Sequence, residues 1–370
     1  MGREFINDIS LFFTGVDKVM NSQIMDFENL MEGAVRAGAT DVHITVGKVP
    51  RMRVDRKLVM GSYHSIMTRE TVLGIIEYIF SQLGSDEVAK RRAVWESKKD
   101  VDCAFTYKSM VRMRVNIYRT GKGESIALRI MQPKRFSVSE IGIPFPAVEF
   151  CNAKGGFFLV SGATGSGKTT TLAALIDVIN KTRTAHVLTV EDPIEYIFED
   201  NHSIISQREV GVHVDSFYSA LRSSLRENPD IVVVGELRDL ETTRIAIEMA
   251  ETGHLVFATL HSRGSVSSID RLVGQFPAGE QNQIRQMISE SLLGILSQRL
   301  FAKKGGGLVA AFELLCATPA VRNLIREQKY GQIYSNIQTG AEVGMVTMES
   351  SIARLIQLGK ISSDSMNKEW

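Results

Sequence analysis

The sequence has few cysteines, no long apolar run and no excess of charge, and each of these absences excludes a class of protein. Its 370 residues include three cysteines, far apart and without a C-x-x-C pair. This excludes a disulfide framework and a four-cysteine zinc module, and it suits a reducing cytoplasm. No apolar run approaches the roughly 18 residues that a membrane helix needs. A formal net charge of +1 argues against a strongly basic nucleic-acid-binding surface.

The remaining composition is that of an ordinary folded protein. Hydrophobic residues make up 44% and charged residues 23% of the chain, and its length suggests two or three domains. Acidic residues and the lack of a cleavage pattern near the beginning argue against a signal peptide. We interpret residues 1–24 as an N-terminal extension and assign no function to them.

One stretch fits the phosphate-binding pattern G-x-x-x-x-G-K-S/T without a gap. Its glycines let backbone N–H groups surround phosphate oxygens, while Lys168 supplies positive charge and Thr169 offers a hydroxyl to Mg²⁺. A predicted strand at residues 156–160 precedes the loop, and a helical pattern follows it, so that the helix N-terminus faces the phosphates. The predicted nucleotide-binding residues here are Gly162, Ala163, Thr164, Gly165, Ser166, Gly167, Lys168, Thr169 and Thr170. The chain is therefore predicted to bind a nucleoside triphosphate.

Four short apolar segments each end in polar residues suited to phosphoryl transfer. We predict them to be strands of one parallel sheet, whose carboxyl ends gather on one edge, where ligands bind. The segments are residues 156–160, 186–190, 231–234 and 255–260. They lead into the phosphate loop, into Glu191 and Glu195, into Glu236, and into His261, respectively.

The chemistry of triphosphate cleavage suggests a role for each of these groups. Glu236 follows a hydrophobic strand, and an acid at that position usually completes the coordination shell of the metal ion. Either Glu195 or Glu191 is suited to polarise the attacking water. His261 is placed to contact the γ-phosphate, whereas His254, at the start of the same segment, is more ambiguous. A single acid at a strand end is more often a solvated turn residue, and a single histidine is more often structural. The convergence of four such ends favours the functional interpretation.

The chain before the phosphate loop has a different pattern. Residues 25–131 show strand-like alternation, a hairpin turn that contains glycine, and two helical stretches. This pattern indicates a compact α+β domain whose sheet has one solvent-exposed face. Residues 132–146 carry three of the eight prolines and are typical of a linker or hinge, and we assign residues 132–149 to it. From residue 150 strands alternate with helices, and beyond Gly305–Gly307 the chain is predicted to be largely helical.

At this point the motifs resemble those of one family, the secretion ATPases of type IV pili and related machines. The run Glu191–Tyr196 resembles the family's Asp box, Gly235–Asp239 its atypical Walker B motif, and Gly253–His261 its His box. The segment Ala320–Glu327 is similar to a signature of the pilus retraction ATPases within this family. Sequence physics alone would favour an exposed surface helix there.

The resemblance implies an α/β fold with a RecA-like P-loop ATPase domain over residues 150–370 and a PAS-like N-terminal domain over residues 25–131. It implies ATP and Mg²⁺ as ligands, with Thr169 and Glu236 at the metal. Glu195 becomes the preferred water-activating carboxylate, and Lys168, Glu236 and His261 complete the catalytic set. His254 and the arginines of the N-terminal domain would join the nucleotide site; these are Arg112, Arg114 and Arg129.

The resemblance also implies a homohexamer that powers pilus retraction and twitching motility from the cytoplasm. Its expected partners are an inner-membrane platform protein, through which alone it would meet the membrane, and a second retraction ATPase; no nucleic acid is expected. Two alternatives stay open, namely an accessory ring subunit of low intrinsic activity and a pilus or secretion assembly ATPase. The absence of a four-cysteine zinc insertion opposes the assembly class. The near-neutral charge opposes a DNA-handling motor.

Overall fold

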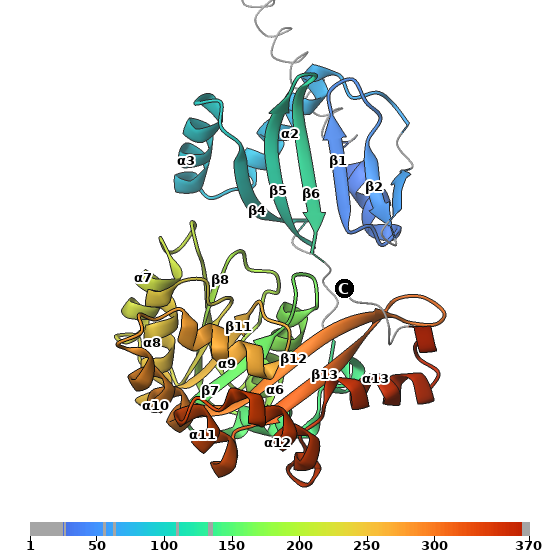
Figure 1. Cartoon of the computed structure of the whole chain (residues 1–370). Helices are drawn as coiled ribbons and strands as arrows, with labels where there is room; N and C mark the ends of the chain where they lie inside the picture. Colours follow the sequence, from blue (N-terminus) through green and yellow to red (C-terminus); the bar gives the residue numbers. More distant parts are fainter. Residues whose placement is uncertain are drawn as a thin grey trace, which may run out of the picture. The chain divides into compact units, whose positions relative to one another are not determined.

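The computed structural model describes residues 25, 27–54, 57–61, 64–108, 111–131 and 136–364. The chain divides into two compact units, residues 1–134 and residues 135–370 (Figure 1). The extension that we predicted over residues 1–24 lies outside the described residues. Among the described helices, none combines the length and the apolar character needed to cross a bilayer.

The first unit is built on an antiparallel sheet in the order β3-β2-β1-β6-β5-β4. Alternate residues of β1 and β5 are buried, which is the pattern of a sheet with one covered face. Helices α2 (Arg69–Ser81) and α3 (Ser85–Glu96) confirm the two helical stretches expected there. The strands are β1 (Asp41–Thr45), β2 (Arg51–Val54), β3 (Lys57–Met60), β4 (Val101–Tyr107), β5 (Val111–Thr120) and β6 (Gly123–Ile130).

The second unit contains a seven-stranded sheet in the order β13-β12-β7-β11-β10-β8-β9. All neighbouring strands are parallel except β12 and β13, so the four predicted strands do lie in one sheet. The strands are β7 (Gly156–Ser161), β8 (His186–Glu191), β9 (Ile204–Glu209), β10 (Ile231–Val234), β11 (Leu255–Leu260), β12 (Leu292–Ala302) and β13 (Leu308–Cys316).

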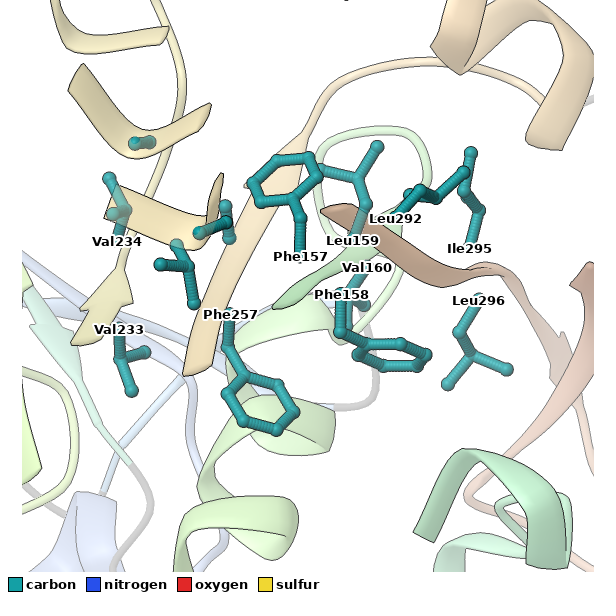
Figure 2. Packing of buried hydrophobic residues seen from close by; sticks show 14 of the residues in the cluster. Phe157, Phe158, Leu159, Val160, Val233, Val234, Phe257, Leu292, Ile295 and Leu296 are labelled. Atoms are coloured by element: carbon teal, nitrogen blue, oxygen red, sulfur yellow. The ribbon is translucent and has the colours of Figure 1, made fainter. Parts of the chain in front are cut away.

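The central strands of this sheet are buried on both faces, as parallel strands covered by helices must be. Figure 2 shows Phe157 and Phe158 of β7 between Phe257 of β11 and Leu296 of β12. All four side chains are at most 1% exposed. The helices are α4 (Val138–Ile141), α5 (Phe145–Glu149), α6 (Lys168–Thr182), α7 (Phe217–Ser224), α8 (Leu240–Glu251), α9 (Ser265–Gly274), α10 (Gln281–Ser291), α11 (Pro319–Arg326), α12 (Ile333–Thr339) and α13 (Met348–Gln357).

The linker that we predicted over residues 132–149 is corrected in its second half. Residues 132–135 lie outside the described residues, whereas residues 138–141 and 145–149 form α4 and α5 in the second unit. Pro146 lies in the first turn of α5, where proline supports a helix because that N–H has no helical partner. Ala147 is fully buried in the core of this unit.

The prediction that the chain is largely helical beyond Gly305–Gly307 is also only partly right. The three glycines, all with positive φ, form the turn of a long antiparallel hairpin between β12 and β13, and helices follow only from α11 onward (Figure 1). Positive φ is the conformation that glycine adopts without steric cost. The apolar runs of this hairpin are buried on both sides, so they lack the alternation that marks a strand.

Candidate active site

Four adjacent strands present polar groups at one edge of the second sheet. In the order β7, β11, β10 and β8, their carboxyl ends lead into the phosphate loop, His261, Glu236 and the loop that carries Glu195. The parallel pairing keeps these ends level, because Ser161 pairs with Leu260 and Val234 with Ala258. The pairing of the strands therefore suffices to bring these polar groups to one edge of the sheet.

Lys168, the first residue of α6, lies inside the phosphate loop. Its ammonium donates hydrogen bonds to the carbonyl oxygens of Gly162 at 2.9 Å and Ala163 at 3.0 Å. The residue is only 8% exposed, and burial lowers its pKa, while nearby Glu236 opposes that effect. A cation at a helix N-terminus among free backbone N–H groups is an arrangement that binds phosphate.

A buried glutamine of β12 supports the phosphate loop through hydrogen bonds. Gln298 donates to the carbonyl oxygen of Ser166 at 2.6 Å and accepts a hydrogen bond from Thr171 at 2.6 Å. A Cβ atom at Gly162 would come within 2.6 Å of the Gln298 carbonyl, and one at Gly167 within 2.9 Å of the Gln298 amide nitrogen. Gly162 is thus required by close packing against backbone as well as by its positive φ, whereas Gly167 is required by its positive φ. Our sequence reasoning missed Gln298, which no local motif marks.

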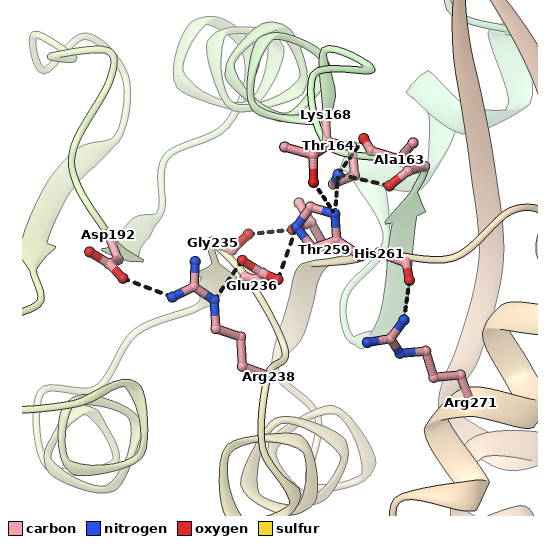
Figure 3. A network of polar contacts seen from close by, with 11 residues as sticks. Ala163, Thr164, Lys168, Asp192, Gly235, Glu236, Arg238, Thr259, His261 and Arg271 are labelled. Atoms are coloured by element: carbon pink, nitrogen blue, oxygen red, sulfur yellow. Dashed lines mark hydrogen bonds and ion pairs between the residues drawn. The ribbon is translucent and has the colours of Figure 1, made fainter. Parts of the chain in front are cut away.

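His261 links the phosphate loop to the end of β10 (Figure 3). Its Nδ1 lies 3.3 Å from the Lys168 ammonium and 3.4 Å from the Thr164 hydroxyl, and its Nε2 lies 2.9 Å from a Glu236 carboxylate oxygen. Burial and the Lys168 charge lower the pKa of His261, with Glu236 opposing them. The neutral ring with its proton on Nε2 satisfies both neighbours, because it donates to Glu236 and accepts from Lys168.

Glu236 continues this chain of contacts toward β8. Its second carboxylate oxygen accepts from Arg238 at 2.7 Å, and Arg238 also donates to Asp192 at 3.1 Å. Thr259 of β11 donates to the Gly235 carbonyl, which fixes the backbone beside the carboxylate. Figure 3 shows the resulting series of contacts from Lys168 to Asp192 across the edge of the sheet.

Glu195 and Glu191 differ in their surroundings. Burial raises the pKa of Glu191, whose carboxylate accepts from Thr189 at 2.7 Å and from the backbone N–H of Glu195. The next residue, Tyr196, places its hydroxyl 3.1 Å from that of Thr170 in the first turn of α6. Glu195 therefore lies in a loop that contacts the phosphate-binding helix, whereas Glu191 holds that loop together.

The prediction that His254 belongs to this site is contradicted by its position. His254 precedes β11, at the amino edge of the sheet, and its Nδ1 lies 3.0 Å from the carbonyl oxygen of Met249. Seven residue steps along β11 separate it from His261, which is about 23 Å at about 3.3 Å per residue. Its role in this unit is to hold the end of α8.

The three predicted arginines lie on the less buried face of the first sheet. Arg112 and Arg114 are two apart in β5, and Arg114 pairs in register with Arg129 of β6. Arg129 also pairs with Asp41 of β1 and forms an ion pair with it at 3.1 Å. The binding of nucleotide phosphates by these arginines stays a prediction.

No cluster of three or more histidine, cysteine or acidic residues able to hold a metal occurs in the part of the chain that the structure describes. Thr169 in the first turn of α6 and Glu236 after β10 offer a hydroxyl and a carboxylate. These hard oxygen donors fit Mg²⁺, which takes few protein ligands and completes its shell with phosphates and water. The residues present are compatible with such an ion.

Comparison with known proteins agrees with this geometry. The family model described as "Type II/IV secretion system protein" matches residues 18–352. The type IV pilus retraction ATPase PilT of Pseudomonas aeruginosa is 41% identical over 345 residues, which are 93% of this chain and 98% of that protein. A twitching motility protein of Neisseria gonorrhoeae is 45% identical over 75% of each chain. The crystal structure of the pilus retraction motor PilT with bound ADP is 40% identical, with a TM-score of 0.81 over 90% of this chain and 94% of that one. The predicted fold class is thereby confirmed.

Proposed function

The chain belongs to the family of type II/IV secretion system proteins, and from this premise we propose that it is a hexameric motor that hydrolyses ATP to power type IV pilus retraction. It is a P-loop ATPase, as its relatives are. Twitching motility would be the result of that retraction in the cell. The similarity to a retraction ATPase extends over nearly the whole length of both chains, so it includes the segments outside the nucleotide site.

One observation carries the proposal: Lys168, His261 and Glu236 are joined by direct contacts at the edge of the sheet where the phosphate loop begins. Lys168 is placed to neutralise charge on the phosphates of ATP. The lowered pKa of His261 favours its neutral ring, whose Nε2–H can exchange the carboxylate of Glu236 for an oxygen of the terminal phosphate as its acceptor. We assign the orientation of the attacking water to Glu195.

Mg²⁺ bound with ATP would supply further charge neutralisation, and Thr169 and Glu236 are the residues that would hold it. The carboxylate of Glu236 has neighbours on both oxygens, namely His261 and Arg238. Its orientation is therefore fixed before any ligand arrives. Such preorganisation lowers the cost of stabilising the transition state.

The remaining parts of the proposal concern assembly and location. We include a homohexamer, a cytoplasmic location at the inner-membrane pilus machine, contact with a platform protein, and cooperation with a second retraction ATPase. Arg112, Arg114 and Arg129 would contact the nucleotide phosphates. Movement of the two units relative to each other would convert hydrolysis into work.

Purified variants test the chemical part of this proposal. Lys168→Ala and Glu195→Ala should each lower the ATPase turnover by orders of magnitude, because each removes charge stabilisation or the orientation of water. Lys168→Ala should also weaken ADP binding, whereas Glu195→Ala should not. Turnover at the wild-type level in either variant would refute the role of that residue.

The unaltered chain separates a motor from an accessory subunit. We expect steady-state ATP hydrolysis by the isolated protein, and negligible hydrolysis despite tight ATP binding would favour the accessory alternative. In cells, deletion of the gene should stop the shortening of pilus filaments. The wild-type gene should restore it, and the Lys168→Ala gene should not. Filaments that still shorten in the deletion strain would refute the retraction role.

A further inference from the structure

The loop that carries Glu195 is held by side chains from the edge strand β9. The carboxylate of Glu209 accepts a hydrogen bond from the backbone N–H of Ile194 at 3.1 Å. The side chain of Gln207 donates to the carbonyl oxygen of Tyr196 at 2.8 Å and accepts from the N–H of Phe198 at 2.8 Å. Three backbone groups on alternate residues are therefore bound to two side chains of one strand.

The period of a β-strand explains why these two side chains act together. Residues two apart in a strand share a face, so Gln207 and Glu209 both point to the loop while Arg208 points away. Arg208 instead contacts Ser223 and Glu227, each at 2.7 Å. Glu209 is only 3% exposed. A buried carboxylate is retained only when it has hydrogen-bond partners, and here the loop backbone supplies one of them.

The contacts hold the loop on both sides of Glu195. Its own backbone N–H is bound by Glu191, and Gln207 also donates to Glu191 at 3.0 Å, so the same set of side chains controls residues 194 to 198. Tyr196 then ties the loop to Thr170 at the start of α6. The position of Glu195 relative to the phosphate loop thus depends on β9, which contributes no residue to any of the recognised motifs.

We propose that Gln207 and Glu209 are positioning residues for ATP hydrolysis, which hold the backbone on both sides of Glu195 so that its carboxylate can orient the attacking water. This rests on the role assigned to Glu195 in the proposed function. A shift of about 1 Å in a catalytic group costs on the order of 10²-fold in rate. Loss of these contacts should therefore reduce kcat and leave the KM for ATP nearly unchanged, since neither side chain belongs to the phosphate loop.

The test uses the full chain in its native oligomeric state. Gln207→Leu removes three hydrogen bonds, and Glu209→Ala removes the acceptor for Ile194, so each should lower kcat at least about 10-fold with less than about a twofold change in KM. Glu209→Gln keeps an acceptor oxygen and should restore most of the turnover. Arg208→Ala, on the opposite face of the same strand, is the matched control and should keep kcat within about twofold. The melting temperature of every variant is measured as a check on folding.

The outcomes separate this inference from the proposed function. If Glu195→Gln keeps normal turnover, the role of Glu195 is refuted, and the positioning role falls with it. If Glu195→Gln loses turnover but Gln207→Leu and Glu209→Ala keep it, only the positioning role is refuted. Equal losses of kcat, ATP affinity and melting temperature would show that the two residues are merely structural. Should Glu209→Ala fail to fold, Gln207→Leu and Glu209→Gln decide the matter by the same criteria.

Discussion

The two edges of the second sheet use similar residues for different purposes. At the carboxyl edge Lys168, His261 and Glu236 contact one another through their side chains. At the amino edge His254 and Arg322 instead bind backbone carbonyl oxygens. Lys168 also donates to the carbonyl oxygens of Gly162 and Ala163, so the difference lies in the side-chain contacts that join the three residues and leave a charged surface on which a ligand can compete for contacts. Residue type alone does not distinguish these cases.

The two histidines of the predicted His box give the largest expected contrast between the edges. His261→Ala should reduce ATPase turnover on the order of 10²-fold, because it removes the group that joins Lys168 to Glu236. His254→Ala should change turnover by no more than about twofold, since its contacts are with the end of α8. Steady-state hydrolysis by the two purified variants at saturating ATP measures this difference.

The melting temperatures of the two histidine variants provide the control for this comparison. Both variants should retain the melting temperature of a folded chain, since each loses one partly buried ring. If His254→Ala lost as much turnover as His261→Ala, the separation of the two edges would not describe the working enzyme. The amino edge would then have to take part in hydrolysis.

The sequence predicted the carboxyl edge well because two features of the sequence indicate each strand there. An apolar run such as Ile231–Val234 indicates a buried strand, and the polar residue that follows indicates its end. It ranked His261 ahead of His254 but still placed both at the nucleotide, because both flank the same run. Only the direction of β11 within the sheet assigns one to each edge, and that direction depends on the pairing with β7 and β10.

Arg322 and Arg326 extend the comparison to the retraction signature in α11. Arg322 donates to the carbonyl oxygens of Ala317, Glu290 and Leu292 at 2.7 to 2.9 Å, and also to Ser289, which completes the end of α10. Arg322→Ala should therefore lower the free energy of unfolding by about 2 kcal/mol. Urea denaturation of the purified variant measures this loss.

Arg326 is the matched control, because it lies on the exposed side of the same helix. Its guanidinium contacts Asn323 at 3.3 Å, so Arg326→Ala should change the unfolding free energy by no more than about 0.5 kcal/mol. We expect this variant to bind nucleotide normally and to fail in pilus retraction. An equal loss of stability in both variants would contradict the distinction and make the whole segment a folding element.

The strands β9 and β12 show where sequence reasoning was insufficient. Leu292–Ala302 follows α10 directly and continues its mixture of apolar and polar residues; the first glycine, Gly294, lies inside the strand rather than directly after the helix. Ile204–Glu209 is a short edge strand, most of whose residues are only partly buried. Gln298, Gln207 and Glu209 act through tertiary contacts, and only the spacing of Gln207 and Glu209 hinted at a shared face.

The smallest expected effect concerns the two carboxylates that the sequence left as alternatives for the catalytic base. Burial raises the pKa of Glu191, so its folded form holds a proton more firmly than its unfolded form, and its contribution to stability is lost as pH rises through the folded pKa. Glu191→Gln removes that cost and keeps an acceptor oxygen for Thr189, so it should stabilise the chain at pH 7. The gain should shrink as the pH falls through 4.5, because the unfolded carboxyl then also takes up a proton, and urea denaturation at several pH values measures this change. Turnover should fall far less than in Glu195→Gln, because the amide keeps an acceptor oxygen for the loop that carries Glu195. A loss of turnover in Glu191→Gln as large as in Glu195→Gln would instead make Glu191 a partner in the chemistry.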